Sequence, residues 1–336
     1  MKKPRIGILG AGFIAGVHAN ILADDDRVEL VGVADLVEDN AARLATRIGH
    51  AQTGSSLEDL FRMDVDTIYV TTPNTRHVDP VVAALEQGFN VFCEKPMATD
   101  LVGGDRVLAA ARDSAGVYNL GMNRRYAWTH DKLKQLIDDR QLAPTSAQFK
   151  LNRGELLRPA WTADPAQTGG FLYETTIHQI DLLRYLLGPI ATLRCAARQT
   201  ISSTEFDDFS MLFTFVSGAT ATLSSCAHSG WSFPFERVEI YGRYATAMTE
   251  ELERVRYALN LDDTVHTEDY THIGFADKGG YAKENRLFVD ALVNGSAPPV
   301  DAEDAAALNL LLACIYESAN NNQEIDFAAR RREHIG

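Results

Sequence analysis

The sequence lacks an apolar run that approaches the roughly 20 residues needed to span a bilayer. Its basic start, MKKPRIGILG, leads into a glycine turn and not into a signal-peptide cleavage site. Cysteine is also scarce, and Cys93, Cys195, Cys226 and Cys314 show neither CxxC nor CxxH spacing. These absences argue against a membrane anchor, a disulfide scaffold and a structural zinc site, so we expect a cytoplasmic protein without a metal.

Positive charge is in deficit. The chain carries 32 Lys and Arg residues against 46 Asp and Glu, a formal net charge of −14, and its basic residues are dispersed. Because this balance repels nucleic acid and anionic lipid, we predict neither partner. What the chain does have is 336 residues that are 46% hydrophobic, enough for a large core and two domains.

Up to about residue 123, short β-rich segments alternate with helical ones. This alternation predicts a parallel sheet with helices on both faces, and the continuous apolar strands agree with burial on both sides. We therefore predict a first α/β domain over residues 1–123. Its expected strands are 5–9, 28–34, 67–72, 90–93 and 117–120, and its expected later helices are 37–48, 78–87 and 100–115.

From about residue 145 the pattern changes to successive strands, which predicts an open, mostly antiparallel sheet of the α+β class. The expected strands are 147–154, 192–198, 206–216, 219–228, 235–243 and 254–261. Helical periodicity returns over 281–293 and 302–319. We therefore predict a second domain over residues 124–336, with C-terminal helices that return towards the first domain.

The segment IGILGAGFIAGVH follows the first expected strand and opens a helix. It places Gly10, Gly12 and Ala15 as G-x-G-x-x-A, the dinucleotide-binding pattern of a Rossmann domain. Gly10 permits the tight turn, Gly12 lets a pyrophosphate approach the backbone, and Ala15 lets the helix pack close to the sheet. The helix N-terminus, at Phe13 and Ile14, would supply N–H donors to the phosphates. The alternative is a purely structural turn.

Asp35 ends the second expected strand, about twenty residues beyond the glycines. A carboxylate there accepts hydrogen bonds from an adenosine ribose and repels a 2′-phosphate. No arginine follows it immediately, so we predict NAD in preference to NADP. The alternative is that Asp35 only caps the helix from residue 37.

The segment TTPNTRH ends the third expected strand at the carboxyl edge of the sheet, where α/β folds hold their ligands. We predict cofactor contacts from Thr72, Pro73, Asn74 and His77. A strand-to-helix turn with an Asn cap explains Pro73 and Asn74 nearly as well.

The segment VFCEKPM puts Glu94 and Lys95 at the end of the next strand, again on the ligand edge. A charged pair directly after a buried strand is costly to place without a function. We predict that both residues contact the cofactor and that Lys95 donates a hydrogen bond to the reacting oxygen. The alternative is a solvated loop in which Pro96 only stops the strand.

The segment YETTIHQID, residues 173–181, sets ionisable groups into an otherwise apolar helix. At roughly 100° per residue, Glu174, His178, Asp181 and Tyr185 share one stripe. An ionisable stripe either faces solvent or lines a site, and a solitary helical histidine is commonly structural. Of the four, Tyr185 is expected to lie in the core.

In combination these motifs resemble the Gfo/Idh/MocA family of nicotinamide-dependent oxidoreductases, which includes inositol and glucose-fructose oxidoreductases. The resemblance rests on four features in order: G-x-G-x-x-A at Gly10, TPN-x-x-H at Thr72, EKP at Glu94, and GG-x-L-x-E-x-x-x-H-x-x-D from Gly169 to Asp181. It covers essentially the whole chain, because a C-terminal pattern also looks like the family's, namely Tyr281, Glu284 and Phe288.

The resemblance implies that Lys95, Glu174 and His178 occupy the positions of the family's Lys, Asp, His catalytic set. His178 would then be the general base or acid on the reacting hydroxyl. The sequence departs at Glu174, where the family usually has Asp, and at Thr176, where it usually has Gly. Glu174 either reaches the substrate or orients His178 across one helical turn, and the sequence leaves both roles open.

Further residues are predicted to line the substrate pocket. Asn123 and Arg124 follow the last strand of the first domain, although ion pairing at the domain junction explains Arg124 nearly as well. Trp161 either stacks on a sugar face or anchors its own loop. Tyr281 resembles a substrate-pocket tyrosine by position, and Asp181 is expected to be a supporting hydrogen-bond partner.

The leading hypothesis is reversible hydride transfer between NAD and a secondary alcohol of a sugar, cyclitol or related polyol. A redox-assisted glycosidase that regenerates its NAD uses the same fold in some family members. A non-catalytic NAD-responsive regulator is the third possibility. The loops at 152–168 and 228–235 are expected to decide which substrate is bound.

The strands FSMLFTFV and ATATLSS are long enough to form a broad apolar face that needs covering. Family resemblance points to association through this sheet. We therefore predict a homodimer or homotetramer.

Overall fold

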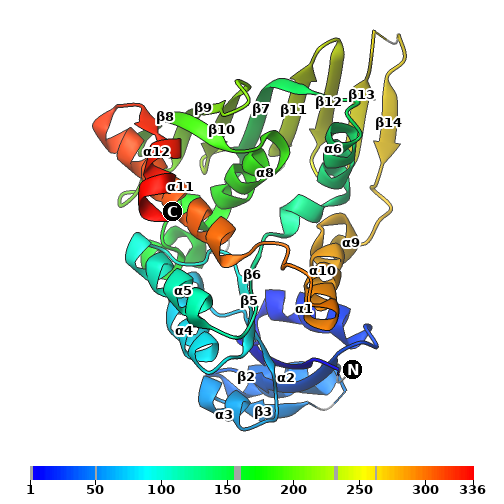
Figure 1. Ribbon diagram of the computed structural model, residues 1–336, viewed down its shortest axis with the longest axis vertical. Coiled ribbons are helices and arrows are strands. Elements are labelled where there is room, and N and C mark those ends of the chain that lie inside the picture. The colour runs from blue at the N-terminus through cyan, green and yellow to red at the C-terminus, as the bar shows by residue number, and fades with distance from the viewer. Residues whose placement is uncertain (1–2, 50, 155–159, 231–233, 262) are drawn as a thin grey trace. The chain divides into compact units, whose positions relative to one another are not determined.

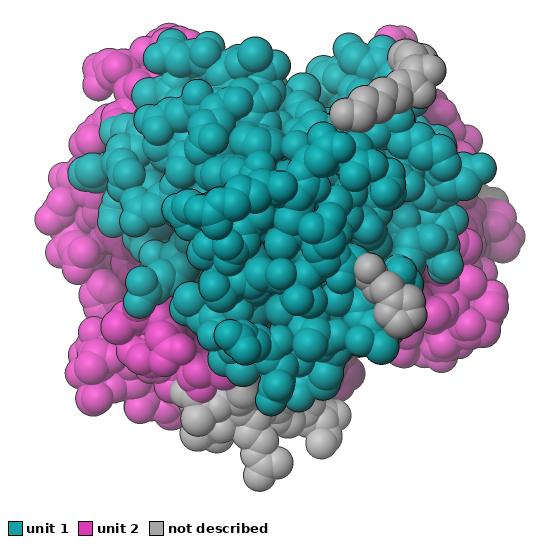
Figure 2. All heavy atoms as spheres, turned by 90° about the horizontal axis from the view of Figure 1, so that it is seen from below, with its two compact units in different colours: residues 1–122, 281–309 teal, residues 123–280, 310–336 magenta. Residues whose placement is uncertain are grey.

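The computed structural model describes residues 3–49, 51–154, 160–230, 234–261 and 263–336. The chain divides into two compact units, coloured teal and magenta in Figure 2. Unit 1 contains residues 1–122 and 281–309, and unit 2 contains residues 123–280 and 310–336. The predicted substrate loops include residues 155–159 and 231–233, which lie outside the described residues.

Unit 1 is built on a parallel sheet of six strands in the order β3-β2-β1-β4-β5-β6. Its strands are β1 (Arg5–Leu9), β2 (Glu29–Ala34), β3 (Gln52–Gly54), β4 (Thr67–Val70), β5 (Asn90–Glu94) and β6 (Tyr118–Gly121). Its helices are α1 (Phe13–Ala23), α2 (Glu38–Arg47), α3 (Leu57–Phe61), η1 (Asn74–Arg76), α4 (Val78–Glu86), α5 (Leu101–Asp113) and α10 (Tyr281–Asn294). This strand order brings the ends of β1 and β4 together at the topological switch point, where Rossmann folds bind dinucleotides.

The core of unit 1 explains why a segment from near the C-terminus belongs to it. Ile6 and Ile8 of β1 pack in one buried cluster with Tyr69, Phe92 and the α10 residue Phe288. The Tyr69 and Phe92 rings stack 4.5 Å apart, and Phe288 meets both edge-on. Burial of these side chains stabilises α10 against α1, beside the sheet (Figure 1).

Unit 2 is built on a mixed, mostly antiparallel sheet of nine strands, in the order β14-β13-β12-β11-β7-β10-β9-β8-β15. Its strands are β7 (Pro144–Asn152), β8 (Ile190–Arg198), β9 (Asp208–Phe215), β10 (Thr220–Cys226), β11 (Glu236–Gly242), β12 (Ala245–Glu250), β13 (Arg254–Ala258), β14 (His266–Asp269) and β15 (Ile325–Asp326). The pair β7 and β10 is parallel.

The helices of unit 2 include the one that carries the YETTIHQID motif. They are η2 (Asn123–Tyr126), α6 (Trp128–Asp138), η4 (Ala160–Ala163), α7 (Pro165–Thr168), the π-helical turn η5 (Leu172–Thr176), α8 (Ile177–Leu187), α9 (Phe275–Lys278) and α12 (Phe327–His334). Helix α8 packs on β7 and α6 packs on β12 and β13 (Figure 1). Helix α11 (Ala302–Asn321) contributes residues to both units.

The two faces of the nine-stranded sheet differ sharply in polarity. On β9, Phe209, Met211 and Phe213 are buried, whereas Ser210 and Leu212 between them are exposed. Because side chains alternate along a strand, Phe209, Met211 and Phe213 point to the helix-covered face. The premise that these strands expose a broad apolar face is therefore wrong.

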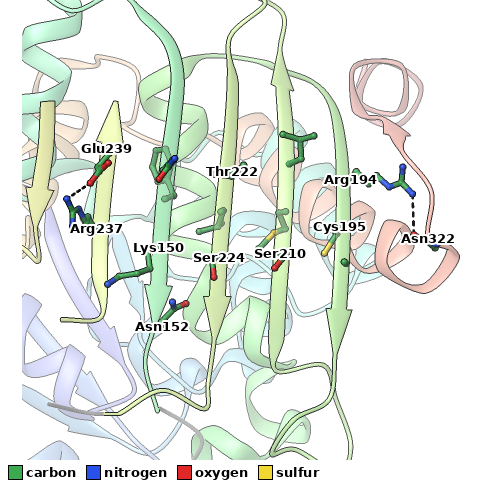
Figure 3. A pocket seen from close by; sticks show the side chains of 16 residues that line it. Lys150, Asn152, Arg194, Cys195, Ser210, Thr222, Ser224, Arg237, Glu239 and Asn322 are labelled. Atoms are coloured by element: carbon green, nitrogen blue, oxygen red, sulfur yellow. Dashed lines mark hydrogen bonds and ion pairs between the residues drawn. The ribbon is translucent and has the colours of Figure 1, made fainter. Parts of the chain in front are cut away.

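The open face of this sheet carries a shallow hollow of about 710 Å³ (Figure 3). Arg194, Ser210, Thr222 and Ser224 line it together with the exposed apolar residue Leu212. Oligomerisation through this face stays a prediction.

Candidate active site

The glycine turn after β1 has the backbone that its sequence predicts. Gly10 has a φ of +92°, and a Cβ atom there would lie 2.7 Å from the carbonyl oxygen of Thr71. The Thr71 hydroxyl lies 3.0 Å from the carbonyl oxygen of Leu9 and 2.9 Å from that of Gly10, and its one hydrogen, given to either carbonyl, ties the ends of β1 and β4 together. Only glycine fits at position 10.

Helix α1 begins directly at this turn. Gly12 precedes it without a side chain to cap it, its first turn carries no acidic residue, and a Cβ atom at Gly12 would meet no atom within 4 Å. Ala15 is fully buried against the sheet. The helix end, at Phe13 and Ile14, thus has the open approach and the positive dipole that a pyrophosphate requires.

Asp35 connects the glycine turn to the start of α2. Its Oδ2 accepts from the backbone N–H of Ala11 at 2.7 Å, and its Oδ1 accepts from that of Val37 at 2.8 Å. A carboxylate has about four lone-pair sites, so ribose hydroxyls can still bind. Beside it Leu36 is 94% exposed, an apolar surface that an adenine ring can cover and that sequence reasoning missed.

The segment after β4 is held against the segment after β5 by a buried histidine. The His77 ring places Nδ1 2.7 Å from the carbonyl oxygen of Pro96 and Nε2 2.8 Å from that of Thr72. Burial lowers the pKa of His77, so the neutral ring donates to one of these carbonyls at a time. His77 thus joins two loops through its ring, and its contact with a cofactor, like those of Thr72, Pro73 and Asn74, stays a prediction.

Glu94 ends β5 and is buried, whereas Lys95 after it is half-buried. One Glu94 oxygen, Oε1, accepts from Nε2 of His18 at 2.8 Å, and the other, Oε2, accepts from the backbone N–H of Lys95 at 3.1 Å. His18 lies in α1 and was missed by sequence reasoning, although a histidine in an apolar helix was a visible signal. Glu94 therefore has a protein contact that fixes the backbone of Lys95.

In unit 2, Glu174 lies in the π-helical turn and His178 in the first turn of α8, and both are half-buried. The Thr176 hydroxyl lies 2.8 Å from that of Ser225, which itself donates to the carbonyl of Leu151 at 3.0 Å. Thr176 is therefore the donor, and it fixes the turn to β10. π-helical turns occur frequently at functional sites.

The residues of the expected ionisable stripe have two kinds of environment. Glu174 and His178 are half-buried, whereas Asp181 is buried in an ion pair. Asp181 is fully buried, and its carboxylate accepts two hydrogen bonds from Arg125, at 2.7 Å from Nε and 2.5 Å from Nη2. The Arg125 guanidinium also stacks 5.3 Å above the ring of Tyr185, which is half-buried. Asp181 thus fixes η2 to α8 and points away from solvent.

Arg124 reaches a buried carboxylate. Its Nη1 lies 3.2 Å from Glu236 Oε2, and the other Glu236 oxygen accepts from Gln179 Nε2 at 2.9 Å. His130 Nε2 lies 3.6 Å from the same oxygen, and burial lowers the pKa of His130. This Glu236 cluster (Arg124, His130, Gln179 and Glu236) was missed by sequence reasoning, and it supports the ion-pairing interpretation of Arg124.

Three other predicted pocket residues have different environments. The Asn123 side chain is buried and donates to the carbonyl of Gly279 at 2.8 Å. Trp161, in η4, is 46% exposed, and Tyr281 begins α10 half-buried. Substrate contacts by these residues stay predictions.

Metal and membrane sites are not evident in the part of the chain that the structure describes. No three His, Cys, Asp or Glu side chains among those residues converge as a metal would require. None of the described helices combines the length and the apolar character needed to cross a membrane. The four cysteines are buried and unbridged.

The fold and the glycine turn define an oxidoreductase of the NAD-binding Rossmann class. Residues 4–122 match the oxidoreductase family with an NAD-binding Rossmann fold, and residues 130–248 match the GFO/IDH/MocA C-terminal domain. The chain belongs to the Gfo/Idh/MocA family, as its motifs predicted.

The chain is similar to several dehydrogenases. The inositol 2-dehydrogenase of Rhizobium meliloti (strain 1021) is 26% identical over 329 residues, which cover 95% of this chain and 98% of that protein. Among solved structures, levoglucosan dehydrogenase in complex with NADH and levoglucosan superposes with a TM-score of 0.89 at 19% identity, covering 97% of this chain and 100% of that one. An oxidoreductase from Agrobacterium radiobacter in complex with NAD+, L-tartaric acid and magnesium gives a TM-score of 0.88 at 17% identity, over 98% and 100% of the two chains. At these identities the structures show a shared fold.

Proposed function

We propose that the protein catalyses reversible hydride transfer between NAD and a secondary alcohol of a sugar, cyclitol or related polyol. The observation that carries the proposal is Lys95 at the carboxyl end of β5, on the same sheet edge as the glycine turn and Asp35. That edge is where a Rossmann fold holds its dinucleotide. The inositol and levoglucosan dehydrogenases among the relatives support the substrate class.

The proposed chemistry divides between the cofactor and three side chains. NAD, when bound, accepts the hydride from the carbinol carbon. His178 takes the hydroxyl proton on an imidazole nitrogen, and Lys95 donates a hydrogen bond from Nζ to the developing alkoxide. Glu174 either contacts a neighbouring substrate hydroxyl or orients His178.

The cofactor preference rests on Asp35. Its carboxylate lies where the ribose 2′-position of a bound dinucleotide is expected, and a negative charge there disfavours the 2′-phosphate of NADP. Because both of its oxygens already accept backbone N–H groups, the side chain is fixed in place before the cofactor arrives. NAD is therefore the proposed cofactor. We also propose a homodimer or homotetramer that forms through the open face of the nine-stranded sheet.

A panel assay tests the function. Purified protein is mixed with NAD or NADP and with myo-inositol, levoglucosan, other polyols and aryl glycosides, and NADH absorbance and released aglycone are both followed. A polyol-dependent rise in NADH supports the dehydrogenase. Aglycone release without net NADH would indicate the glycosidase, and tight NAD binding without either product would indicate the regulator.

A further inference from the structure

A chain of buried hydrogen bonds runs from helix α10 through α1 to the end of β5. Asn285 Nδ2 lies 2.8 Å from the carbonyl oxygen of Tyr281 and 2.8 Å from Nδ1 of His18. His18 Nε2 lies 2.8 Å from Glu94 Oε1, and Glu94 Oε2 accepts from the backbone N–H of Lys95. All of these groups belong to unit 1.

Contacts at both ring nitrogens fix the orientation of the His18 ring. Nδ1 lies 2.8 Å from Asn285 Nδ2 and 3.2 Å from Asn285 Oδ1, so the amide can give a hydrogen to the ring or accept one from it. At the other nitrogen the partner is the Glu94 carboxylate, which only accepts, so Nε2 is the donor. The ring thus holds one Glu94 oxygen while the other accepts from the Lys95 N–H.

Packing also fixes the orientation of the His18 ring. His18 is fully buried, and Phe92 meets its ring edge-on at a centroid distance of 4.9 Å. Tyr69 and Tyr281 lie 5.7 and 5.9 Å away on other sides. A side chain locked by packing holds its hydrogen-bond partner in one geometry.

We propose that His18, oriented by Asn285, is a positioning residue for Lys95: it holds the Glu94 carboxylate where that group fixes the Lys95 backbone and balances the ammonium charge. This inference rests on the proposed function, in which Lys95 contacts the reacting oxygen. It assigns α1 a second role, because the helix that begins at the glycine turn also supports the reacting end of the site.

Electrostatics support the same assignment. Burial raises the pKa of Glu94, but the hydrogen bond and electrostatic attraction from His18, together with the charge and backbone N–H of Lys95, lower it by more, so the net shift is downward. The titratable groups around Glu94 are His18, Lys95, Cys93 and His77. In a variant without His18, the hydrogen bond that opposes the effect of burial is lost, so the pKa of Glu94 is expected to rise.

The test compares His18→Leu, which removes the donor, with His18→Gln, which retains an N–H donor. The probe is NAD with the most active polyol of the panel, beginning with myo-inositol. Because small displacements of a catalytic group cost roughly 10- to 100-fold in rate, His18→Leu is expected to lose about that much kcat with little change in KM or in NAD affinity. The acidic limb of its kcat profile is expected to move to higher pH, and His18→Gln is expected to recover part of the loss.

Asn119→Ala is the matched control. Asn119 is equally buried in unit 1 and donates to the Leu120 carbonyl at 3.2 Å, while it accepts from the Val300 N–H at 3.0 Å, away from Glu94. It is expected to lower the melting temperature without changing kcat or its pH profile. Equal kcat losses in the control and in His18→Leu would mean that His18 matters only for stability, and would overturn the proposal.

Further measurements separate the possible failures. If Lys95→Ala keeps full activity, the proposed role of Lys95 fails; if Lys95→Ala is inactive and His18→Leu is fully active, only the positioning role fails. A crystal structure of His18→Leu needs no substrate: a displaced Lys95 backbone supports the proposal and an unmoved one overturns it. If His18→Leu does not fold, Asn285→Leu, which removes the hydrogen-bond partner of Nδ1, gives the same comparison, and an unchanged kcat there overturns the inference.

Discussion

Two glutamates make the same backbone contact in the two units but in different surroundings. Glu94 accepts from the backbone N–H of Lys95 at 3.1 Å, and Glu205 accepts from that of Phe171 at 2.6 Å, just before the turn that carries Glu174. Glu94 also accepts a hydrogen bond from Nε2 of His18. For Glu205, the second oxygen is buried without a hydrogen-bond partner among the described residues.

The difference appears in their protonation. The pKa of Glu94 is lowered, because the hydrogen bond from His18 and the charge of Lys95 outweigh the effect of burial. Burial and the nearby charge of Asp207 raise the pKa of Glu205, against the opposing Phe171 N–H. A buried carboxylate is therefore held as an anion where several donors and charges oppose burial, and His18 and Lys95 supply them for Glu94. In the proposed function, Glu94 is the carboxylate that balances the Lys95 ammonium.

Lys95→Ala removes the ammonium of the residue whose backbone Glu94 fixes, and it has the largest expected effect on kcat. Loss of the ammonium removes the hydrogen bond to the developing alkoxide, so kcat is expected to fall on the order of 10²- to 10⁴-fold. NAD affinity, measured by calorimetry, is expected to stay near wild type, because the glycine turn and Asp35 are untouched. An active Lys95→Ala would make Glu94 a structural carboxylate with no part in the chemistry.

His178→Asn tests the second proposed catalytic side chain, which lies in unit 2. The imidazole is the proposed proton acceptor during oxidation, so its loss is expected to cost about 10²-fold in kcat. Raising the pH is expected to restore part of the rate, because solvent base then removes the hydroxyl proton. A variant as active as wild type across the pH range would place the proton acceptor elsewhere, and Gln179→Ala on the same helix controls for loss of packing.

The fold of unit 1 was largely predictable, because its buried parallel strands are continuous apolar runs and its turns carry glycine at defined positions. The short strand β3 and helix α3 were not predicted, since QTG and LEDLF have too few residues to show a period. In unit 2, helix α6 and strands β12 and β14 were likewise missed. The alternation on β9 was available in FSMLFTF, but it was interpreted as an apolar face instead of as one buried and one polar face.

Of the candidate site, the sequence predicted the residues at strand ends but not their supports. Parallel strands bring Gly10, Asp35 and Lys95 to one sheet edge by topology alone. The contact between His18 and Glu94 joins residues 76 positions apart, and that between Glu236 and Gln179 joins residues 57 positions apart. Spacing carries no signal for such pairs, because they meet only through tertiary packing.

Asp35 is a third carboxylate to compare with Glu94 and Glu205, and it is half-exposed and faces the proposed cofactor. Asp35→Asn tests its role. Asparagine removes the charge and keeps one acceptor oxygen, for the N–H of either Ala11 or Val37, whereas its NH2 group faces the other N–H. The ratio of kcat/KM for NADP to that for NAD is expected to rise about tenfold, equivalent to ~1.4 kcal/mol. Asp39→Asn, an exposed change of the same charge in α2, is the control, and an equal ratio in both variants would remove Asp35 from cofactor selection.

Glu205→Gln has the smallest expected effect, and it tests directly the difference in pKa shift between Glu94 and Glu205. The raised pKa means that the folded protein holds this proton more tightly than the unfolded chain does. Stability from Glu205 is therefore present at acidic pH, and is lost as the pH rises from the ordinary carboxyl range through the raised folded pKa. Glutamine stays neutral and keeps an acceptor for the Phe171 N–H.

The melting temperature of Glu205→Gln should therefore match wild type at about pH 4 and exceed it by roughly 1 to 2 °C at about pH 8. Glu324→Gln, an exposed change of the same charge in unit 2, should show no such divergence. For Glu94→Gln the sign reverses: the lowered pKa stabilises the fold above the carboxyl range, so the variant should be less stable than wild type near neutrality and should approach it as the pH falls. Divergence of the same sign in both glutamate variants would contradict the view that the His18 donor sets these two carboxylates apart.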